Sequence, residues 1–249
     1  MNRTLITTLT SALCLTAGLA LGQTPAVTNT PPKSPPWDIS AAAGLTLTRG
    51  NSDTLLFTAN VAADKKWGQN EVAFGADGVY GENNSVVNAN QLHGFGQYNR
   101  LFTDRFYAYL RADGLHDEIA GINYRLSIGP GVGYYFIKTT NTMLRAEIGP
   151  GYIYEHDTDG TTHSYATLRL AERFEQKLSD HAKFWEAVEF LPQVDRFSNY
   201  IFNGEIGVET TMTKKLNLLT YLQDTYHSEP PPGRLKNDLK LVAAIKYKF

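Results

Sequence analysis

The stretch Leu241-Val242-Ala243-Ala244-Ile245-Lys246-Tyr247-Lys248-Phe249 closes the chain and alternates between two kinds of side chain. Its odd-numbered positions are all apolar, whereas its lysines, Lys246 and Lys248, are even-numbered and continue the parity of Lys240 just before it. Successive side chains of a β-strand point to opposite faces. The pattern therefore predicts a strand with one apolar face and one cationic face.

The last residue of this strand is aromatic. An apolar strand face that ends in this way resembles the sorting signal of bacterial outer-membrane barrels, so Ile245, Tyr247 and Phe249 are predicted to form a C-terminal assembly signal. The expected partners of such a signal are periplasmic chaperones and the outer-membrane barrel assembly machinery. The alternative is an amphipathic edge strand of a soluble sandwich.

The N-terminal region has the pattern of a secretory signal peptide. Arg3 precedes an uncharged apolar run from Leu5 to Leu21, and Ala20-Leu21-Gly22 is a small-x-small cleavage site. Residues 1–22 are therefore predicted to be removed, together with Cys14, the only cysteine. Residues 23–36 are proline-rich and are predicted to form an extended, disordered periplasmic linker.

Composition limits what residues 37–249 can be. They are long enough for one large domain, and no run of about 18 apolar residues follows the signal, which argues against a transmembrane helix. The mean hydropathy of −0.30 suits a membrane barrel as well as a soluble protein, because half of each barrel strand faces a polar lumen. The formal net charge of −2 gives no indication of nucleic-acid binding.

The region 37–249 divides into alternating segments separated by turn residues, each long enough to cross a bilayer, which takes about 9–11 tilted residues. Glu172 and Glu186 interrupt otherwise apolar faces. The pattern predicts an all-β fold, a monomeric twelve-stranded antiparallel transmembrane outer-membrane β-barrel. The expected strands are 37–49, 54–67, 70–82, 89–101, 105–116, 123–136, 142–155, 163–177, 183–195, 200–213, 216–227 and 237–249.

The connections between these segments differ by parity. The even-numbered ones are tight, as at Gly68-Gln69, whereas most odd-numbered ones are longer and polar, as at 228–236. Short periplasmic turns and longer external loops are typical of outer-membrane barrels. An even strand count also predicts that both ends of the barrel domain lie on the periplasmic side.

Aromatic residues gather at the expected strand ends, where their amphipathic rings suit the lipid headgroups. Those predicted for the periplasmic interface are Trp67, Phe102, Phe106, Phe136, Phe184, Trp185, Tyr247 and Phe249. Those predicted for the external interface are Tyr80, Tyr124, Tyr154, Tyr165, Tyr200 and Tyr226.

Several motifs resemble those of a known family. They are Gly44-Leu45-Thr46-Leu47-Thr48-Arg49-Gly50-Asn51-Ser52-Asp53-Thr54, Lys66-Trp67-Gly68, Gly75-Ala76-Asp77-Gly78-Val79-Tyr80-Gly81-Glu82, Ala120-Gly121, and Gly-Pro-Gly at 129–131 and 149–151. The chain is similar over 37–249 to a domain-of-unknown-function family labelled salt-induced outer-membrane proteins (YdiY-like). The resemblance implies an outer-membrane barrel and supplies no catalytic residues.

Charges of both signs fall on the face predicted to line the lumen. Opposed charges there can pair to plug the barrel, or they can line a narrow polar pore; pairing is the cheaper way to bury them. The predicted lumen-lining charges are Glu71, Asp77, Arg111, Asp113, Arg125, Arg145, Glu147, Arg169, Arg173, Glu205 and Glu209, with Glu189, Lys240, Lys246 and Lys248 beside them.

One predicted external loop contains residues that can bind metal. The stretch His156-Asp157-Thr158-Asp159-Gly160-Thr161-Thr162-His163 offers oxygen ligands for a hard cation and two histidines for zinc. The same residue types are those that tight turns require, and no acid follows at the spacing of a calcium loop. The turn interpretation is therefore preferred, and neither a metal site nor a cofactor is predicted.

The pair His163-Ser164 invites a comparison with twelve-stranded outer-membrane phospholipases. A nucleophilic serine needs its histidine on the same face, and adjacent strand residues point to opposite faces. The chain is therefore predicted not to be an enzyme. The expected function is a narrow passive pore or an envelope-stabilising protein among the lipids of a Gram-negative-type outer membrane, tied by the resemblance to osmotic or salt stress. The alternatives are an outer-membrane hydrolase and a surface receptor or adhesin.

Two prolines fall in neighbouring predicted strands. If the ladder is centred on the turn near Thr140, Pro130 lies opposite Pro150 and Arg125 lies opposite Glu155. Proline cannot donate to a ladder, so this level is predicted to be a bend or weak point, with the flanking glycines leaving the lumen face clear.

Overall fold

The computed structural model describes residues 36–49, 54–83 and 86–249, so the predicted signal peptide and most of the linker lie outside the described residues. No helix long and apolar enough to cross a membrane occurs within these ranges. The strands are β1 (Asp38–Arg49), β2 (Thr54–Trp67), β3 (Asn70–Asn83), β4 (Val86–Leu101), β5 (Phe106–Asp117), β6 (Ile122–Lys138), β7 (Thr142–Asp157), β8 (Thr162–Lys177), β9 (Ala182–Gln193), β10 (Arg196–Thr211), β11 (Leu216–His227) and β12 (Asn237–Lys248).

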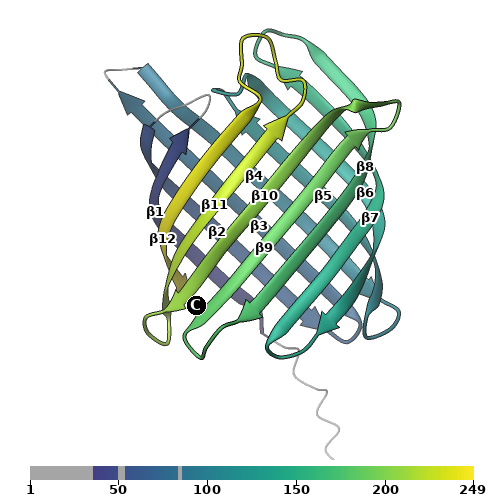
Figure 1. Cartoon of the computed structure of the whole chain (residues 1–249), viewed down its shortest axis with the longest axis vertical. Coiled ribbons are helices and arrows are strands. Elements are labelled where there is room, and N and C mark those ends of the chain that lie inside the picture. The colour runs from purple at the N-terminus through teal and green to yellow at the C-terminus, as the bar shows by residue number, and fades with distance from the viewer. Residues whose placement is uncertain (1–35, 50–53, 84–85) are drawn as a thin grey trace, which may run out of the picture. The chain divides into compact units, whose positions relative to one another are not determined.

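These strands form one closed antiparallel barrel, in which each strand pairs with its neighbours in sequence and β1 pairs with β12 (Figure 1). The closing ladder runs from Ser40 opposite Lys248 to Arg49 opposite Leu239. The predicted twelve-stranded barrel is confirmed, and the soluble edge strand is wrong, because β12 pairs on both of its sides.

The alternation seen in the sequence separates the outer surface from the lumen. In β1, Leu45 and Leu47 are about half exposed, whereas Thr46 and Thr48 are buried. The same parity continues through the ladder to β12, where Leu241 is exposed and Val242 is buried. Every second side chain therefore faces the membrane side, and the others fill the interior.

Both acidic exceptions lie on this outer surface. Glu172 pairs with Val188, and Glu186 pairs with Phe174, on the face opposite to that of Arg173. The belt of exposed apolar side chains is thus interrupted at β8 and β9.

The two ends of the barrel differ less in loop length than expected. We call the end that carries Lys248 the terminal end and the other the loop end. At the loop end, the connections 118–121, 158–161 and 194–195 are as short as the turns at the terminal end, and 228–236 is the long one among those described. The prediction of longer external loops is wrong for these three connections. Strands β6 and β7 pair as far as Ile122 opposite Asp157, which leaves fewer residues in the connections beside them.

The two prolines lie where the turn-centred register predicts. The β6–β7 ladder pairs Ile128 with Tyr152 and Val132 with Ile148, and its hydrogen-bonded pairs stop between these two levels. Arg125 lies opposite Glu155, as expected. A methyl group on Gly129 would overlap the carbonyl oxygen of Pro150, so glycine permits the close approach of the two strands.

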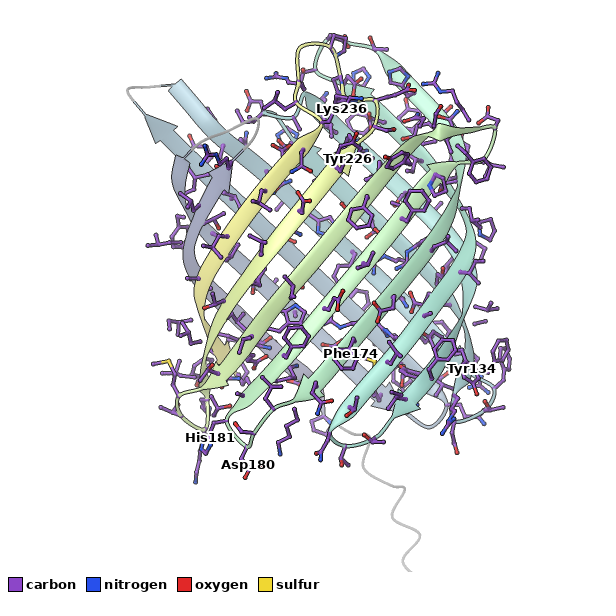
Figure 2. The ribbon with its side chains drawn as sticks, viewed as in Figure 1. Tyr134, Phe174, Asp180, His181, Tyr226 and Lys236 are labelled. Carbon is purple, nitrogen blue, oxygen red and sulfur yellow. The ribbon has the colours of Figure 1, made fainter. Side chains whose placement is uncertain are left out.

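Aromatic side chains form two bands on the outer surface. Figure 2 places Tyr134 and Phe174 toward the terminal end and Tyr226 toward the loop end. Tyr226 stacks on its neighbour Tyr200, with ring centroids 5.7 Å apart. The prediction is wrong for Trp185 and Tyr165, whose positions alternate with outward-facing neighbours so that their side chains lie on the lumen face.

Candidate functional site: the charged lumen

The predicted lumen charges occupy inward-facing positions, and each contacts another lumen side chain. Glu71, Arg125, Glu147 and Glu209 are buried, although charged residues rarely are unless they are paired. The pairings are Asp77 with His93, Arg111 with Asp113, Arg125 with Glu155, Arg145 and Arg169 with Glu147, Arg173 with Glu175, Glu205 with Trp185, and Glu209 with Lys246. Glu71 accepts hydrogen bonds from Asn99 and Tyr135 and lies 3.7 Å from the Lys66 ammonium.

Glu147 accepts three hydrogen bonds inside the lumen. Its Oε1 accepts a hydrogen bond from the Tyr107 hydroxyl at 2.7 Å and another from the Gln97 amide at 2.9 Å. Its Oε2 accepts from Arg169 Nη1 at 2.7 Å. These donors come from β5, β4 and β8, so one carboxylate on β7 ties together strands that are not neighbours in the ladder.

The same set of contacts extends toward β3 and β9. Glu71 on β3 accepts from the Tyr135 hydroxyl of β6 at 2.8 Å. Arg169 also donates to Glu189 on β9 at 2.6 Å. We call this set the charged network; its members are Glu71, Gln97, Asn99, Tyr107, Tyr109, Tyr135, Arg145, Glu147, Arg169 and Glu189.

Glycines of β6 make room for two tyrosines of the network. The Tyr109 ring lies over Gly131 and the Tyr107 ring over Gly133, where any side chain would overlap the rings. Alternation in the sequence predicts the lumen charges but does not single out these tyrosines. The alternating glycines of β6 would have indicated them, because their partners in β5 are Tyr107 and Tyr109 themselves.

The opposite part of the lumen is apolar at its centre. We call this cluster the apolar patch; it consists of the buried residues Ala42, Trp185, Leu219, Val242 and Ala244, with Tyr221 packed against them. Trp185 donates its indole N–H to Glu205 Oε1 at 2.6 Å, so its one polar atom is satisfied. The lumen therefore has a hydrogen-bonded wall facing a packed wall.

Toward the loop end, a histidine bridges two carboxylates. His93 Nδ1 lies 2.9 Å from Asp77 Oδ1, and its Nε2 lies 3.7 Å from Asp113 Oδ1. Asp113 in turn receives two contacts from Arg111, whose guanidinium lies 4.3 Å from the centre of the Phe95 ring. Each charge in this group is compensated by a neighbour, which suits burial in a barrel wall.

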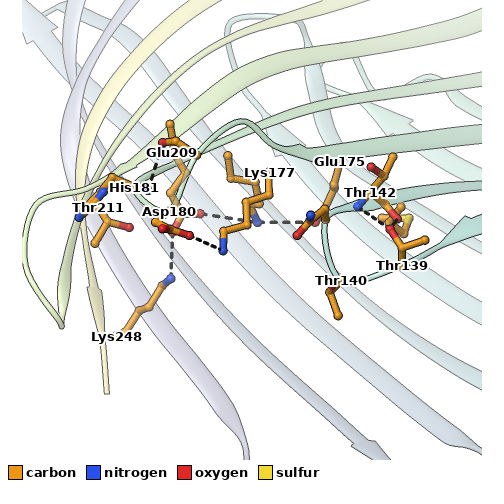
Figure 3. A pocket seen from close by; sticks show the side chains of 15 residues that line it. Thr139, Thr140, Thr142, Glu175, Lys177, Asp180, His181, Glu209, Thr211 and Lys248 are labelled. Carbon is orange, nitrogen blue, oxygen red and sulfur yellow. Dashed lines mark hydrogen bonds and ion pairs between the residues drawn. The ribbon is translucent and has the colours of Figure 1, made fainter.

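The terminal end opens into a cavity of about 310 Å³, shown in Figure 3. At its inner edge, Glu209 contacts Lys248 at 3.1 Å, Lys246 at 3.3 Å and Lys183 at 3.8 Å. Hydroxyl-bearing turns line the rim, including Thr139 of the β6–β7 turn. The mouth of the lumen at this end is therefore polar and offers space to a small hydrophilic solute.

The sequence His156–His163 forms a turn. Asp159 Oδ1 accepts the backbone N–H of Thr161 at 2.8 Å, and this hydrogen bond holds the pKa of the Asp159 carboxyl below its usual value. Gly160 has φ of 89°, a conformation that glycine adopts readily. Within the described ranges, no three potential ligands among histidine, cysteine, aspartate and glutamate gather to hold a metal ion.

His163 and Ser164 point to opposite faces, as the strand period requires. His163 pairs in the ladder with Glu155 and lies 3.4 Å from Asp157, whereas Ser164 pairs with the outward-facing Tyr154. This pair does not form a serine–histidine dyad.

Sequence comparison now assigns the family. The profile described as "Protein of unknown function, DUF481" matches residues 41–249, almost the whole barrel. The chain belongs to this family. It is also 26% identical over 129 residues to "Uncharacterized protein YdiY" of Escherichia coli (strain K12), a match that covers 52% of this chain. The matched region spans about half the length of that relative.

Two solved structures with a similar fold are porins. The chain is similar to the NanC porin, with a TM-score of 0.58, 8% identity, and coverage of 85% of this chain and all of that one. It is also similar to the KdgM porin in complex with disordered oligogalacturonate, with a TM-score of 0.50, 8% identity, and coverage of 84% and 99%. At such identity the likeness establishes the fold, the antiparallel barrel of outer-membrane proteins.

Proposed function

We propose that this protein is a narrow passive pore of the outer membrane. The observation that carries the proposal is the wall of the lumen opposite the apolar patch, which is polar and charged from the cavity at the terminal end to the His93 group near the loop end. A barrel that served only as a membrane anchor could be filled by apolar side chains throughout. The porin fold of the two structural neighbours supports the same function.

The pore is narrow because side chains occupy much of its section. Tyr107 is fully buried and Tyr109 is 4% exposed, although both belong to the lumen face. Pore diameter and the donors and acceptors along the wall set what passes. Paired charges give such a wall polarity without a strong excess of one sign, which suits small ions and hydrophilic solutes.

A planar-bilayer recording tests this proposal. The refolded wild-type barrel is expected to give small conductance steps, and Tyr109→Ala is expected to enlarge them by opening the section above Gly131. Tyr98→Ala, at a 43% exposed tyrosine on the outer surface of β4, is the matched control and leaves the steps unchanged. Silence from wild type and Tyr109→Ala alike overturns the pore.

A closed barrel that stabilises the envelope is the second candidate. It is favoured by the apolar patch, where Val242 and Ala244 are almost fully buried on the lumen side, and by the pairing of the lumen charges. Under this alternative, a strain without the protein leaks periplasmic enzymes under osmotic shock, whereas the isolated barrel conducts nothing. The reverse pair of results favours the pore. In either role, hydrolysis of outer-membrane lipids by the refolded protein is not expected.

Assembly and orientation follow from the C-terminal strand. In this proposal residues 1–22 are cleaved, the terminal end faces the periplasm, and Ile245, Tyr247 and Phe249 are read by chaperones and the assembly machinery. The Phe249 backbone N–H donates to the Ile39 carbonyl at 3.1 Å, so this residue also completes the closing seam. Deletion of Phe249 is expected to deplete the outer-membrane fraction, as measured by immunoblot, without lowering synthesis; normal membrane levels contradict this assignment.

The link to salt stress rests on the resemblance alone. Under this proposal the abundance of the protein rises when cells are shifted to high salt, and a strain without it grows more slowly after the shift. Unchanged abundance and growth in both conditions remove the link and leave the pore untouched.

A further inference from the structure

The long connection 228–236 between β11 and β12 is fixed at its base. The His227 backbone N–H donates to the Lys236 carbonyl at 2.7 Å. Ser228 exchanges two hydrogen bonds with Tyr200 of β10, one through its backbone N–H at 3.0 Å and one through its hydroxyl at 2.7 Å. We call residues 228–236 the strap. Its start is therefore tied to two neighbouring strands.

The strap reaches the opposite side of the barrel mouth. A Cβ added at Gly121, in the β5–β6 connection, would lie 3.3 Å from Pro231 Cβ and 3.2 Å from Arg234 Nε. In the closed barrel, β7–β10 lie between these two connections on one side and β1–β4 on the other. The two connections are thus diametrically opposed, and a contact between them must cross the loop-end mouth.

A second contact crosses the lumen just below the strap. Arg125 on β6 and His227 on β11 lie 3.3 Å apart, measured from Nη2 to Nδ1. Arg125 also pairs with Glu155 of β7, which holds the guanidinium in place. Because β6 and β11 are separated by β7–β10, this contact spans the mouth along the same line as the strap.

The β5–β6 connection, which the strap contacts at Gly121, is itself held in place. The Thr158 backbone N–H of the β7–β8 connection donates to the Gly121 carbonyl at 2.9 Å. Within the strap, Pro230, Pro231 and Pro232 limit the backbone, and Arg234 N–H closes a turn on the Pro231 carbonyl at 3.1 Å. A proline-stiffened segment that rests on both rims obstructs the opening more than a flexible loop of equal length.

We propose that the strap sets the size limit of the pore at its loop end, so that inorganic ions pass and sugars are excluded. This inference rests on the proposed function, because a size limit presupposes a conducting lumen. The strap crosses the loop-end mouth, whereas the terminal end opens into a cavity of about 310 Å³, so the narrower point of the pore is expected at the strap.

The first experiment removes the crossing contacts without changing the length of the strap. The double variant Pro231→Gly/Arg234→Ser is compared with Pro232→Gly, which alters an exposed proline of the same run. Planar-bilayer conductance is measured together with swelling of liposomes in arabinose, glucose and sucrose. Both variants are first checked for the gel mobility of a folded barrel before heating.

The double variant is expected to raise conductance about twofold or more, since aperture controls conduction. It should also admit sugars that wild type and Pro232→Gly exclude. Equal conductance and equal sugar exclusion in the double variant and wild type overturn the strap. If wild type and double variant are both silent, the pore itself is overturned, and the size limit with it.

A second experiment locates the strap without relying on conduction. A bimane fluorophore is attached at Ala120→Cys, beside Gly121, and Pro232→Trp supplies a quencher that acts only at short range. Strong quenching is expected, and Lys214→Trp at the terminal end is the control that should leave the fluorescence unquenched. Absence of quenching by Pro232→Trp means that the strap does not cross the mouth and overturns the proposal even if the barrel conducts.

Discussion

The charged network and the apolar patch face each other across the lumen, and they close the barrel interior by different means. The network uses one buried carboxylate, Glu147, to hold donors from three other strands. The patch uses small side chains such as Ala42 and Ala244 against Trp185. The charged network depends on the orientation of its side chains, because a hydrogen bond weakens steeply when it departs from a linear geometry. The apolar patch depends mainly on volume.

This difference has an energetic consequence. Removing one partner from a buried charged group leaves the others unpaired, which costs more than the pair contributed. Replacing a buried side chain in an apolar cluster by one of equal volume costs little. We therefore expect the two walls to respond very differently to single substitutions.

The largest expected effect is at Glu147. Glu147→Ala leaves Arg145 without its carboxylate and removes the acceptor of Tyr107, so it should destabilise the barrel by about 3–5 kcal/mol. On the opposite side, Thr46 is fully buried, its hydroxyl has no hydrogen-bond partner, and Thr46→Val preserves its volume. That variant should leave the barrel at least as stable as wild type, because it removes a buried hydroxyl that has no hydrogen-bond partner. Urea unfolding in lipid measures the free energy of unfolding of both variants. Equal losses of stability would contradict the expected difference between the charged network and the opposite wall.

An intermediate effect separates the two faces of a single strand of the charged wall. Ile128 is 55% exposed on the outer surface of β6, and Ile128→Arg should cost about 2–4 kcal/mol near the bilayer centre. Ser127 lies one residue away on the lumen face, with its hydroxyl 3.5 Å from Asp113 Oδ2. Ser127→Arg should cost much less, because its charge gains a carboxylate neighbour. The same urea titration decides, and similar costs would contradict the assignment of faces.

Most of the fold could be predicted because a period of two is a strong signal over twelve strands. The bounds expected for β2 and β11 match the structure, whereas β10 begins at Arg196 and not at residue 200. Arg196 belongs to a polar stretch that does not look like a strand. Strand β10 nevertheless starts there, because Arg196 pairs irregularly with Gln193 across the β9–β10 hairpin. Pairing of this kind is invisible in the composition of one segment.

The membrane-facing acids show a related limit. The sequence marks Glu172 and Glu186 as exceptions to an apolar face, but it does not determine where they meet. Their ladder partners, Val188 and Phe174, place both on adjacent strands of the outer surface. Placing these two residues side by side requires the register between β8 and β9, which the sequence of one strand does not contain.

The site was partly predictable for a similar reason. Alternation put the charges on the inward face, yet it could not tell which would meet across strands that are not neighbours, as Glu71 and Tyr135 do. The strap was missed because its far contact, Gly121, is more than a hundred residues away in the chain. Neither contact leaves a local pattern.

The smallest expected effect is kinetic and lies within the charged wall itself. Pro130 and Pro150 lack backbone donors, and the β6–β7 ladder has no paired residues between Ile128 and Val132. Amides at Gly129, Gly131, Gly149 and Gly151 should therefore exchange with solvent faster than those of β12 beside the apolar patch, although the charged wall holds more side-chain hydrogen bonds. A segment opens more readily where fewer of its backbone hydrogen bonds are protected. Side-chain contacts such as that of Tyr109 over Gly131 shield the amides only in part. Hydrogen exchange read by mass spectrometry of the lipid-embedded barrel measures this. Uniformly slow exchange across both regions would contradict this prediction, because it would mean that the side-chain contacts of the charged network protect these amides as well as the missing ladder bonds would have done.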